Sequence, residues 1–546
     1  MVGNAGHLLR RASGRRLLPD KGGSWLVLPL GRSTDELPAS PLPFAGEPTL
    51  ALLDALRCLA TAAHDERVDG VVLRFRGGLS GWSKALALRR AVDELREAGK
   101  AVVAWGETFS AEEYLVASGA DRVWLPESGN LLLVGVLVEQ FFLRELLERF
   151  EVQPEVVRVG GYKTAAELLT HSEMSPEQRE QIESWLDDLY SELVAGIARG
   201  RGLDPQRVRE RIDCGPYPAA SAIESGLIDG CLYPDQLPDA LQEFASLPRG
   251  GRDGPRRVRL VEAIPYFRWV VADPGWRPLR TDLPRIAYVV ASGPIHRGAG
   301  SRGIASESYR HLLDDLAQEK GVRGVVLRVD SPGGDAIASD LLFRAIGQLS
   351  REKPVIVSMG DVAASGGYYL AAAADCVYAE AGTLTGSIGV VGGKLNLAGL
   401  YRRLGVAKGS VERGARAGML SEARGFTPDE YEALRGGMQA VYETFLARVA
   451  TGRKLSLEAV GRLAQGRIWS GLRAKSLGLV DAIGGPLEAL QEACRRAGLV
   501  AGERFVLEFH PRRRRLGLAR LLGTALQALG FGGSGRLGGR GPWLGG

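Results

Sequence analysis

The chain has 546 residues, of which 45% are hydrophobic and 24% charged, and its formal net charge is +5. This composition is that of a soluble globular protein, and the length predicts several domains. The small net charge gives no support to nucleic-acid binding. Five scattered cysteines without a C-x-x-C pair, and six dispersed histidines, argue against disulfides and zinc. We therefore expect no metal and no cofactor and, since no apolar run reaches about 18 residues, no membrane span.

The chain begins with a basic stretch, residues 1–23, which we expect to form an arm without an export signal. A strand is predicted from Trp25, and a helix over residues 50–63. The segment that follows, VDGVVLRFR from Val68, returns as VRGVVLRVD from Val322, which is an offset of 254 residues (322 − 68).

The same offset holds from residue 70 to residue 135 of the first copy. It relates Tyr114 to Tyr368, Asp121 to Asp375 and Gly135 to Gly389. A register kept over that length indicates an internal duplication. Each copy alternates short Val- and Leu-rich strands with helical stretches, which is typical of βαβ units around a largely parallel sheet.

The duplication predicts an α/β protein made of two tandem βαβ domains. In chain order we expect a basic arm over residues 1–23, a first repeat over 24–245, a Pro/Gly/Arg-rich linker over 246–284, a second repeat over 285–507 and a separate basic tail over 508–546.

One serine occupies the turn between a predicted strand and a predicted helix. Residues 354–358 form an apolar, β-branched run, and residues 370–374 are strong helix formers. Between them, Ser365 is flanked by small residues, where a nucleophile can be exposed at the edge of a sheet. The start of a helix also leaves N–H groups free to receive an oxyanion. The alternative is that Ser365 only caps the helix, because serine is a common N-cap.

The two copies differ at the positions that would carry this chemistry. The counterpart of Ser365 in the first copy is Ala111 (365 − 254), and the counterpart of Lys163 in the second copy is Ala417 (163 + 254). One copy thus has the serine without the lysine, and the other has the lysine without the serine. This reciprocity indicates a single site shared by both copies. The alternative is that Lys163 is an ordinary surface lysine.

Two further differences favour chemistry in the second copy. The second copy has a Pro-Gly-Gly turn with Gly333 and Gly334 where the first copy has RGGL at 76–79. Such a turn can present consecutive N–H groups at φ values that only glycine tolerates. Ser387 corresponds to Leu133, which suggests a polar role for Ser387 near Ser365.

These residues resemble the motifs of the signal peptide peptidase A family, also called protease IV, in its long, internally duplicated form. The resemblance covers roughly residues 25–500. In chain order, the motifs are GYKTA at 161–165, MSP at 174–176, SPGG at 331–334, AASGGY at 363–368, LTGSIG at 384–389, GRIWSG at 466–471 and GLVD at 478–481.

The resemblance implies a crotonase/Clp-protease-like fold in each repeat and a serine endopeptidase with a Ser–Lys dyad. On the matching positions, Ser365 is the nucleophile, Lys163 the general base and Ser387 the hydroxyl that orients the lysine. The oxyanion-binding N–H groups would be those of Gly333, Gly334 and Gly366. The family further implies a homotetramer that degrades cleaved signal peptides and other unfolded peptides. Long-form members usually carry an N-terminal membrane anchor, and we expect none in this chain.

A Ser–Lys dyad makes a specific demand on the lysine, because only the neutral amine can take a proton from serine. The ordinary lysine pKa of about 10.4 must fall by roughly three units, which corresponds to roughly 4 kcal/mol. Burial at the junction of the repeats would lower it. A neighbouring hydroxyl such as Ser387 would not restore the charge, whereas a carboxylate would.

Other interpretations use other residues. A Ser-His-Asp triad would need His296 or His311, and neither lies in a motif. The glycine-rich run at 389–394 (GVVGGK) lacks the Ser or Thr that follows the lysine of a phosphate-binding loop, so a turn is predicted there. Two other functions stay open at this point: a crotonase-type enzyme acting on acyl-CoA, and a non-catalytic membrane-associated scaffold.

The tail combines a run of arginines, 512–515, with leucines at helical spacing. The apolar positions are Leu518, Leu521, Leu522, Ala525 and Leu529. This spacing predicts a basic amphipathic helix, which can lie on an anionic membrane surface. We therefore expect peripheral association with the inner membrane. The alternatives are that the apolar face packs on protein, and that the protein is cytoplasmic.

Overall fold

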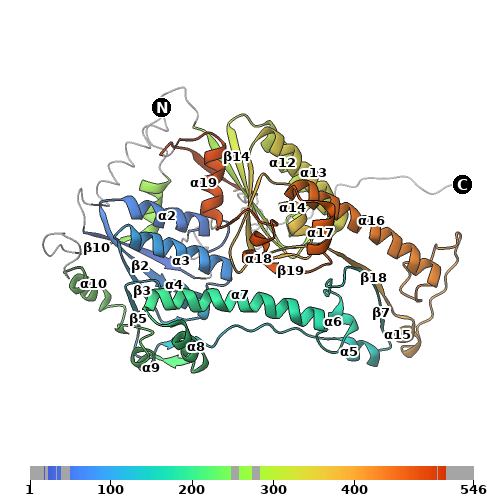
Figure 1. The fold of residues 1–546 in the computed structure, drawn as a ribbon, viewed down its shortest axis with the longest axis horizontal. Coiled ribbons are helices and arrows are strands. Elements are labelled where there is room, and N and C mark those ends of the chain that lie inside the picture. Colours follow the sequence, from blue (N-terminus) through green and yellow to red (C-terminus); the bar gives the residue numbers. More distant parts are fainter. Residues whose placement is uncertain are drawn as a thin grey trace, which may run out of the picture. The chain divides into compact units, whose positions relative to one another are not determined.

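A computed structural model (Figure 1) describes residues 18, 23–31, 34–37, 50–246, 258–272, 283–500 and 502–511. Through Phe509 the chain forms one compact unit, and a second unit begins at His510. Nearly all of the predicted arm and the amphipathic segment of the tail lie outside the described residues. Within the ranges described, no helix is long and apolar enough to cross a membrane.

The first repeat is built on a parallel sheet with the strand order β10-β1-β2-β3-β5-β9. Its inner strands are apolar and buried, because helices pack on both faces. The strands are β1 (Ser24–Leu30), β2 (Val68–Phe75), β3 (Ala101–Gly106), β5 (Arg122–Leu125), β9 (Gly230–Cys231) and β10 (Arg259–Glu262), with a small sheet of β4 (Thr108–Phe109), β6 (Asn130–Leu131) and β8 (Tyr217–Pro218). The helices include α2 (Leu52–His64), α3 (Trp82–Glu97), α4 (Ala111–Ala117), α8 (Pro205–Asp213), α9 (Ala219–Glu224) and α10 (Leu237–Ser246).

The second repeat has the strand order β19-β17-β15-β14-β11-β21, with β16 and β20 beside β15. Strands β11, β14, β15 and β16 pair in parallel, as the sequence predicts. The strands are β11 (Arg285–Ser292), β12 (Ile295–His296), β13 (Ile304–Ala305), β14 (Val322–Ser331), β15 (Val355–Ala364), β16 (Cys376–Ala379), β17 (Leu384–Gly386), β19 (Ile468–Ser470), β20 (Ala482–Ile483) and β21 (Val506–His510). The helices include α12 (Ser306–Gln318), α13 (Ala336–Glu352), α14 (Gly366–Ala371), α17 (Leu457–Leu463), α18 (Gly471–Ser476) and α19 (Pro486–Arg496).

The duplication is visible in side-chain contacts as well as in the sheets. Tyr114 Oη donates to the carbonyl of Leu227 at 2.6 Å, and Tyr368 Oη donates to that of Leu479 at 2.9 Å. One long helix in each repeat, α7 (Pro176–Arg201) and α16 (Pro428–Arg453), spans 26 residues. The offset between equivalent residues of the two repeats is 254 in the segments before these helices. It is 252 (428 − 176) where the helices begin. The predicted α/β fold with two tandem repeats is confirmed.

A two-stranded antiparallel ribbon connects the repeats (Figure 1). Strand β7 (Gln153–Val159) of the first repeat pairs with β18 (Val390–Asn396) of the second. Short helices flank the ribbon: α5 (Arg144–Arg149), α6 (Glu167–Thr170) and α15 (Ala398–Arg403). The turn predicted over 389–394 is wrong, because residues 390–394 belong to β18. Lys394 Nζ donates to the carbonyls of Met419 and Ser421, which also argues against a phosphate site.

The stretch predicted as a linker contains ordered elements. Its described residues, 258–272, form β10, α11 (Ala263–Tyr266) and a π-helix, η1 (Phe267–Val271), and β10 pairs in parallel with β1. The buried side chains of Val261 and Tyr266 anchor this segment to the first repeat. The linker prediction missed these elements because the apolar run that forms them is short and the residues around it are rich in Pro, Gly and Arg.

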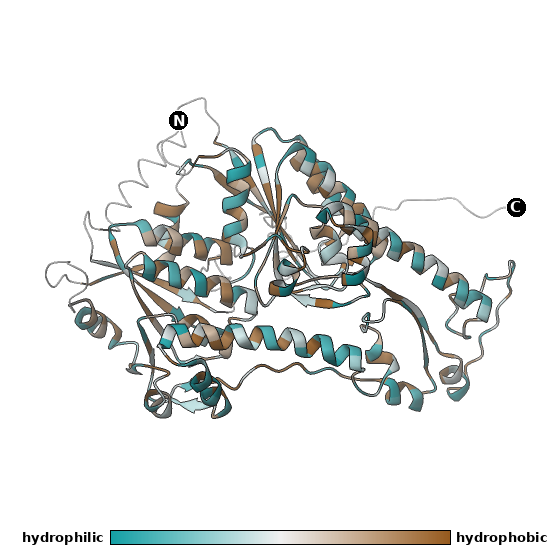
Figure 2. Ribbon diagram, in the orientation of Figure 1, coloured by the Kyte–Doolittle hydropathy of each residue, from teal (hydrophilic) through white to brown (hydrophobic). Residues whose placement is uncertain are grey.

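The hydrophobic core is continuous across the two repeats. One cluster contains Leu56 of α2 and Leu490 of α19, which come from different repeats, while a second cluster lies beneath α13 and α14. Figure 2 shows hydrophobic and hydrophilic residues alternating along α7, as expected of a helix with one buried face. The two repeats therefore form one packed body.

Candidate active site

Ser365 stands at the end of β15 and directly before α14. Its φ of 54° and ψ of −117° are unusual for a residue other than glycine, and such strain costs roughly 1–3 kcal/mol. Its backbone N–H donates to the carbonyl of Gly386 at 2.8 Å, which holds this conformation. Its side chain makes no capping hydrogen bond, so the capping interpretation is not supported.

The first repeat shows what an ordinary cap looks like at this turn. The strand register pairs Phe109 with Leu131, as it pairs Ala363 with Thr385, so the offset of 254 still holds and Ala111 is the counterpart of Ser365. Here Ser110 Oγ accepts a hydrogen bond from the N–H of Glu113 in a capping box. Ser365 of the second repeat stands one residue after the position that corresponds to Ser110 (110 + 254 = 364). Its side chain contacts Lys163 and does not cap the helix.

Lys163 lies in the loop that follows β7, and residues of the second repeat hold this loop. The N–H of Tyr162 donates to the carbonyl of Gln465 at 2.8 Å. A Cβ on Gly466, whose φ is +80°, would lie 2.5 Å from the backbone nitrogen of Lys163. Only glycine therefore permits this approach. The β7–β18 ribbon brings the loop to the turn that contains Ser365.

The lysine amine contacts both predicted hydroxyl partners. Lys163 Nζ lies 2.9 Å from Ser365 Oγ, 2.9 Å from Ser387 Oγ and 2.9 Å from the carbonyl oxygen of Ser387. The side chain of Lys163 is only 5% exposed, and this burial lowers its pKa from 10.5 to about 8. A substantial fraction of the amine is therefore neutral at mildly alkaline pH, and neutral amine can accept a proton.

The predicted oxyanion residues gather at the same turn. Gly333, with a φ of +101°, packs so closely that a Cβ on it would lie 2.7 Å from the nitrogen of Gly366. Its own N–H donates to Ser331 Oγ at 3.1 Å. Among the described residues, the N–H groups of Gly334 and Gly366 have no acceptor. Gly366 and Gly334 are thus better placed than Gly333 to receive an oxyanion.

The matching turn of the first repeat is closed by a carboxylate. The N–H of Leu79, the counterpart of Gly333 (79 + 254), donates to Glu113 Oε1 at 3.2 Å, and the N–H of Ser110 donates to Oε2 at 3.0 Å. Glu113 is 2% exposed, and burial raises its pKa. In the first repeat, a buried carboxylate therefore occupies the N–H groups of Leu79 and Ser110.

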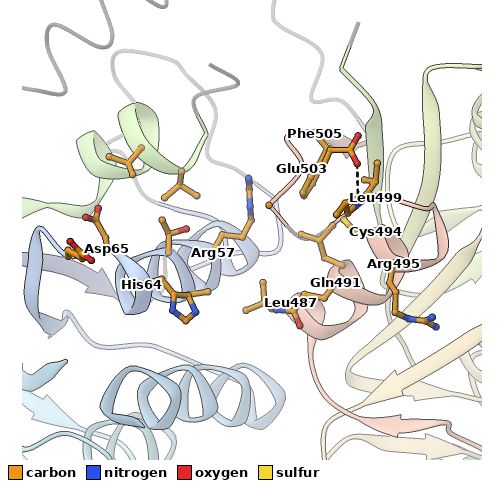
Figure 3. Close-up of a pocket in the computed structure, with 18 of the residues that line it drawn as sticks. Arg57, His64, Asp65, Leu487, Gln491, Cys494, Arg495, Leu499, Glu503 and Phe505 are labelled. Atoms are coloured by element: carbon orange, nitrogen blue, oxygen red, sulfur yellow. Dashed lines mark hydrogen bonds between the residues drawn. The ribbon is translucent and has the colours of Figure 1, made fainter. Parts of the chain in front are cut away.

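A groove of about 480 Å³ lies along the ribbon beside the lysine loop. It is lined mainly by apolar residues of β7, β18 and α6, among them Pro154, Val156, Leu169, Val391 and Leu395. A wider cavity of about 920 Å³ lies between α2, η1 and α19 (Figure 3) and contains none of the predicted site residues. A search for the site by cavity size alone would therefore not have found Ser365.

The competing histidine triad has no support in the geometry. Both ring nitrogens of His296 interact with backbone carbonyls, those of Arg297 and Arg302. His311 is exposed on α12. The part of the chain that the structure describes also contains no group of three or more His, Cys, Asp or Glu side chains that could hold a metal ion.

Sequence reasoning did not assign a role to Gly466 or Gln465. Both lie at or beside the GRIWSG motif, and they receive the lysine loop of the other repeat. Gln181 of α7 adds a further link, because its side chain donates to Thr164 Oγ1 at 2.9 Å and accepts from the N–H of Ile468 at 3.0 Å. The GRIWSG motif indicated that these positions matter. The sequence alone could not show that they contact the lysine loop, which lies about 300 residues earlier.

Comparison with known proteins identifies the family. The sequence matches peptidase family S49 twice, over residues 94–247 and 347–499, one match in each repeat. The chain therefore belongs to peptidase family S49, and the class of protein is a peptidase with duplicated, Clp-protease-like domains.

Particular relatives extend the similarity to most of the chain. It is 34% identical to the protein named serine protease SPPA, chloroplastic, of Arabidopsis thaliana, over 82% of this chain and 66% of the relative, which is just under two thirds of that protein. It is 30% identical to Protease 4 of Salmonella typhi, over 82% of this chain and 72% of the relative. It is 29% identical to Protease 4 of Haemophilus influenzae, over 81% and 72%. The resemblance to the signal peptide peptidase A family is confirmed.

Proposed function

We propose that this protein is a serine endopeptidase in which Ser365 is the nucleophile and Lys163 the general base. The observation that supports it is the 2.9 Å distance between Lys163 Nζ and Ser365 Oγ, with the lysine buried. Nucleophile and base come from different repeats, which agrees with the reciprocal loss of each residue in the other copy. Ser387 is a positioning residue, because it contacts the lysine through both its hydroxyl and its carbonyl.

In the proposed reaction, Ser365 Oγ attacks the carbonyl carbon of a peptide bond while its proton moves to neutral Lys163 Nζ. The carbonyl oxygen becomes an oxyanion, which the N–H groups of Gly366 and Gly334 would stabilise. The C–N bond then breaks, and the ammonium returns the proton to the leaving amine. Water attacks the resulting ester, Lys163 takes its proton, and Ser365 leaves with that proton to regenerate the site.

The proposed substrates are unfolded, apolar peptides, including cleaved signal peptides. The groove beside the lysine loop supports this class, because its lining is mostly aliphatic and it follows an extended ribbon. An extended peptide with apolar side chains fits such a surface better than a charged or folded one. The core of a signal peptide is an apolar segment of this kind.

The test is turnover of a fluorogenic apolar peptide by three proteins: wild type, Ser365→Ala and Lys163→Ala. We expect both variants to lose activity by at least about a thousandfold while retaining the wild-type circular dichroism spectrum. Full turnover by either variant would contradict the dyad. If wild type cleaves no peptide but hydrolyses an acyl-CoA thioester, the crotonase alternative applies. If it does neither, the scaffold alternative applies.

Two further proposals concern partners and location. We propose that the protein assembles as a homotetramer. We also propose that the basic tail, residues 508–546, holds the protein at the surface of the inner membrane, with a cytoplasmic location as the alternative. The membrane proposal rests on the sequence, since residues 512–546 lie outside those described. Co-sedimentation with anionic vesicles should be salt-sensitive and should disappear when the chain is ended after Pro511; equal binding by both proteins would contradict it.

A further inference from the structure

Arg467 of the GRIWSG motif stands between two aromatic rings that come from different repeats. Its guanidinium carbon lies 4.7 Å from the ring centroid of Tyr162, which directly precedes Lys163, and 4.8 Å from the ring centroid of Trp469. Both distances are typical of a cation–π contact. The Nε–H of Arg467 is buried and has no acceptor among the described residues, so the faces of the two rings stabilise this side of the cation.

A carboxylate of α7 completes the arrangement. Arg467 Nη2 donates to Glu180 Oε1 at 2.7 Å, and Tyr162 Oη donates to Glu180 Oε2 at 2.8 Å. The side chain of Arg467 is only 22% exposed, although that of Glu180 is 52% exposed. Tyr162 and Glu180 belong to the first repeat, whereas Arg467 and Trp469 belong to the second. We call these four side chains the arginine clasp.

The arginine clasp also contacts the backbone that holds the proposed nucleophile. The indole ring of Trp469 packs on Gly386, where a Cβ would lie 2.8 Å from Trp469 Cδ1. The carbonyl of Gly386 accepts the hydrogen bond from the N–H of Ser365, and the carbonyl of Arg467 accepts one from the N–H of Ser387 at 2.7 Å. The clasp therefore touches the serine turn on one side and the lysine loop on the other.

The first repeat has an aromatic residue but no arginine at the corresponding place. The helices that follow, α9 and α18, begin 252 residues apart (471 − 219). With this offset, Trp469 corresponds to Tyr217, and Arg467 corresponds to Gly215. A side chain does not fit at Gly215, because a Cβ there would collide with the carbonyl oxygen of Leu133. The arginine thus occurs in the repeat that carries the proposed nucleophile, whereas both repeats keep an aromatic ring.

We propose that Arg467 is a positioning residue: by clamping Tyr162 against Trp469, it fixes the lysine loop relative to the serine turn. Without the guanidinium, the Tyr162 ring loses its cation–π partner, and Glu180 loses one of the two donors that it shares with the loop. The loop is then free to shift, and Lys163 Nζ moves away from Ser365 Oγ. The catalytic consequence rests on the function proposed above, whereas the structural one does not.

Hydrogen exchange tests the positioning without using activity. Arg467→Met keeps a side chain of similar length but removes the cation. Amide exchange in the peptide that contains residues 160–164 should become faster by at least about tenfold, because the loop opens more often. Arg467→Lys keeps a cation between the rings and should accelerate exchange less, and it carries the comparison if Arg467→Met does not retain the wild-type circular dichroism spectrum.

The matched control is Arg473→Met. Arg473 also links the second repeat to α7, because its Nε donates to Asp188 Oδ2 at 2.7 Å, but this contact lies about two helical turns beyond Glu180. Exchange of the lysine loop in the control should equal that of wild type. Unchanged exchange in the Arg467 variants, or equal acceleration in Arg473→Met, would overturn the proposal.

Kinetics test the catalytic consequence. For a fluorogenic apolar peptide, Arg467→Met should lower kcat/KM by roughly tenfold to a hundredfold, mainly through kcat. The midpoint of its pH profile should move from near 8 to higher pH, because a loosened loop admits water to the Lys163 amine and weakens the desolvation that lowers its pKa. Arg473→Met should keep the wild-type midpoint. An unchanged kcat and midpoint in Arg467→Met would overturn the catalytic part of the proposal.

Failure of the proposed function gives a different result. If wild type cleaves no peptide, or if Ser365→Ala cleaves it as fast as wild type, the dyad is wrong. The exchange comparison then still decides whether Arg467 holds the loop, because it measures the backbone around Lys163 and not turnover.

Discussion

At the scale of single residues, the proposed chemistry depends on the charge of Lys163. Its amine is buried with two hydroxyls and a carbonyl as hydrogen-bond partners, and desolvation is the cause of its lowered pKa. These partners accept from the amine without adding a negative charge that would stabilise the ammonium. The environment thus favours the neutral form, in which a lysine can act as a base.

The first prediction concerns the pH dependence of kcat/KM. Because the free enzyme is active only when Lys163 is neutral, kcat/KM should rise with pH through a single ionisation near 8 and reach a plateau on the alkaline side. A series of initial rates between pH 6 and pH 10 measures this profile. A rate that falls as pH rises through 8 would contradict the role of the lysine.

The second prediction uses stability in place of activity. The pKa of Lys163 is about 8 in the folded protein and near 10.5 when unfolded, so the unfolded chain binds more protons between these values and stability rises with pH there. Lys163→Met removes this penalty. Below pH 8 it should stabilise the protein by up to roughly 3 kcal/mol, at about 1.4 kcal/mol per pKa unit. Denaturant unfolding at pH 7 and pH 9 should show the gain shrinking at the higher pH; a constant difference would argue against a buried, titrating lysine.

The third prediction concerns Ser387. Removing its hydroxyl takes away one of three hydrogen bonds to Lys163 Nζ and leaves the carbonyl contact in place. We expect Ser387→Ala to lower kcat/KM by roughly fivefold, since one hydrogen bond contributes about 1 kcal/mol. Ser387→Thr, which keeps a hydroxyl, should recover part of the rate. An undiminished rate in Ser387→Ala would remove this residue from the site.

At the scale of elements, the site depends on loops of one repeat fitting against the other. The fourth prediction tests this fit at Gly466, where a Cβ would lie 2.5 Å from the backbone of Lys163. Gly466→Ala should displace the lysine loop and reduce kcat/KM by roughly a hundredfold, the typical effect of a misplacement of about 1 Å. Gly461→Ala is the matched control, because a Cβ there meets no atom within 4 Å. Equal activity of the two variants would mean that this contact does not position the lysine.

The elements also show which features a single sequence can predict. The repeat offset and the reciprocal loss of Ser365 and Lys163 are visible in the sequence, because both are comparisons within one chain. Strand β18 was mistaken for a turn because Gly392 and Gly393 are poor strand formers. The structure gives the reason for Gly393: a Cβ there would lie 2.1 Å from the carbonyl oxygen of Glu155. That neighbour lies on β7, which is more than 200 residues earlier, and local patterns carry no information about it.

At the scale of the whole molecule, buried polar contacts link the two repeats. Arg90 of α3 donates to both oxygens of Glu380, at 2.6 and 3.0 Å, and to Glu488 of α19 at 2.6 Å. Asp361 of β15 accepts a hydrogen bond of 2.7 Å from the N–H of Ser83, at the start of α3, and so caps a helix of the other repeat. These contacts fix the repeats in one relative position, which a site divided between them requires.

The fifth prediction concerns the arginine in this network. Glu380 is 1% exposed, so Arg90→Ala would leave a buried carboxylate without its partner and should destabilise the protein by roughly 3 kcal/mol. Arg462→Ala breaks an ion pair whose side chains are 67% and 84% exposed and should cost less than about 1 kcal/mol. Denaturant unfolding compares the two variants. Similar small losses in both would show that the buried network does not hold the repeats together.

Active-site labelling tests the composite dyad most directly. A fluorophosphonate probe reacts with an activated serine, and digestion followed by mass spectrometry locates the labelled residue. We predict that wild type is labelled at Ser365, and that Lys163→Ala, although folded and still carrying Ser365, is labelled more slowly by at least about a hundredfold because its hydroxyl has lost the base. Labelling of Ser365 at the same rate in both proteins, or labelling of a different serine, would contradict a site in which the first repeat activates the serine of the second.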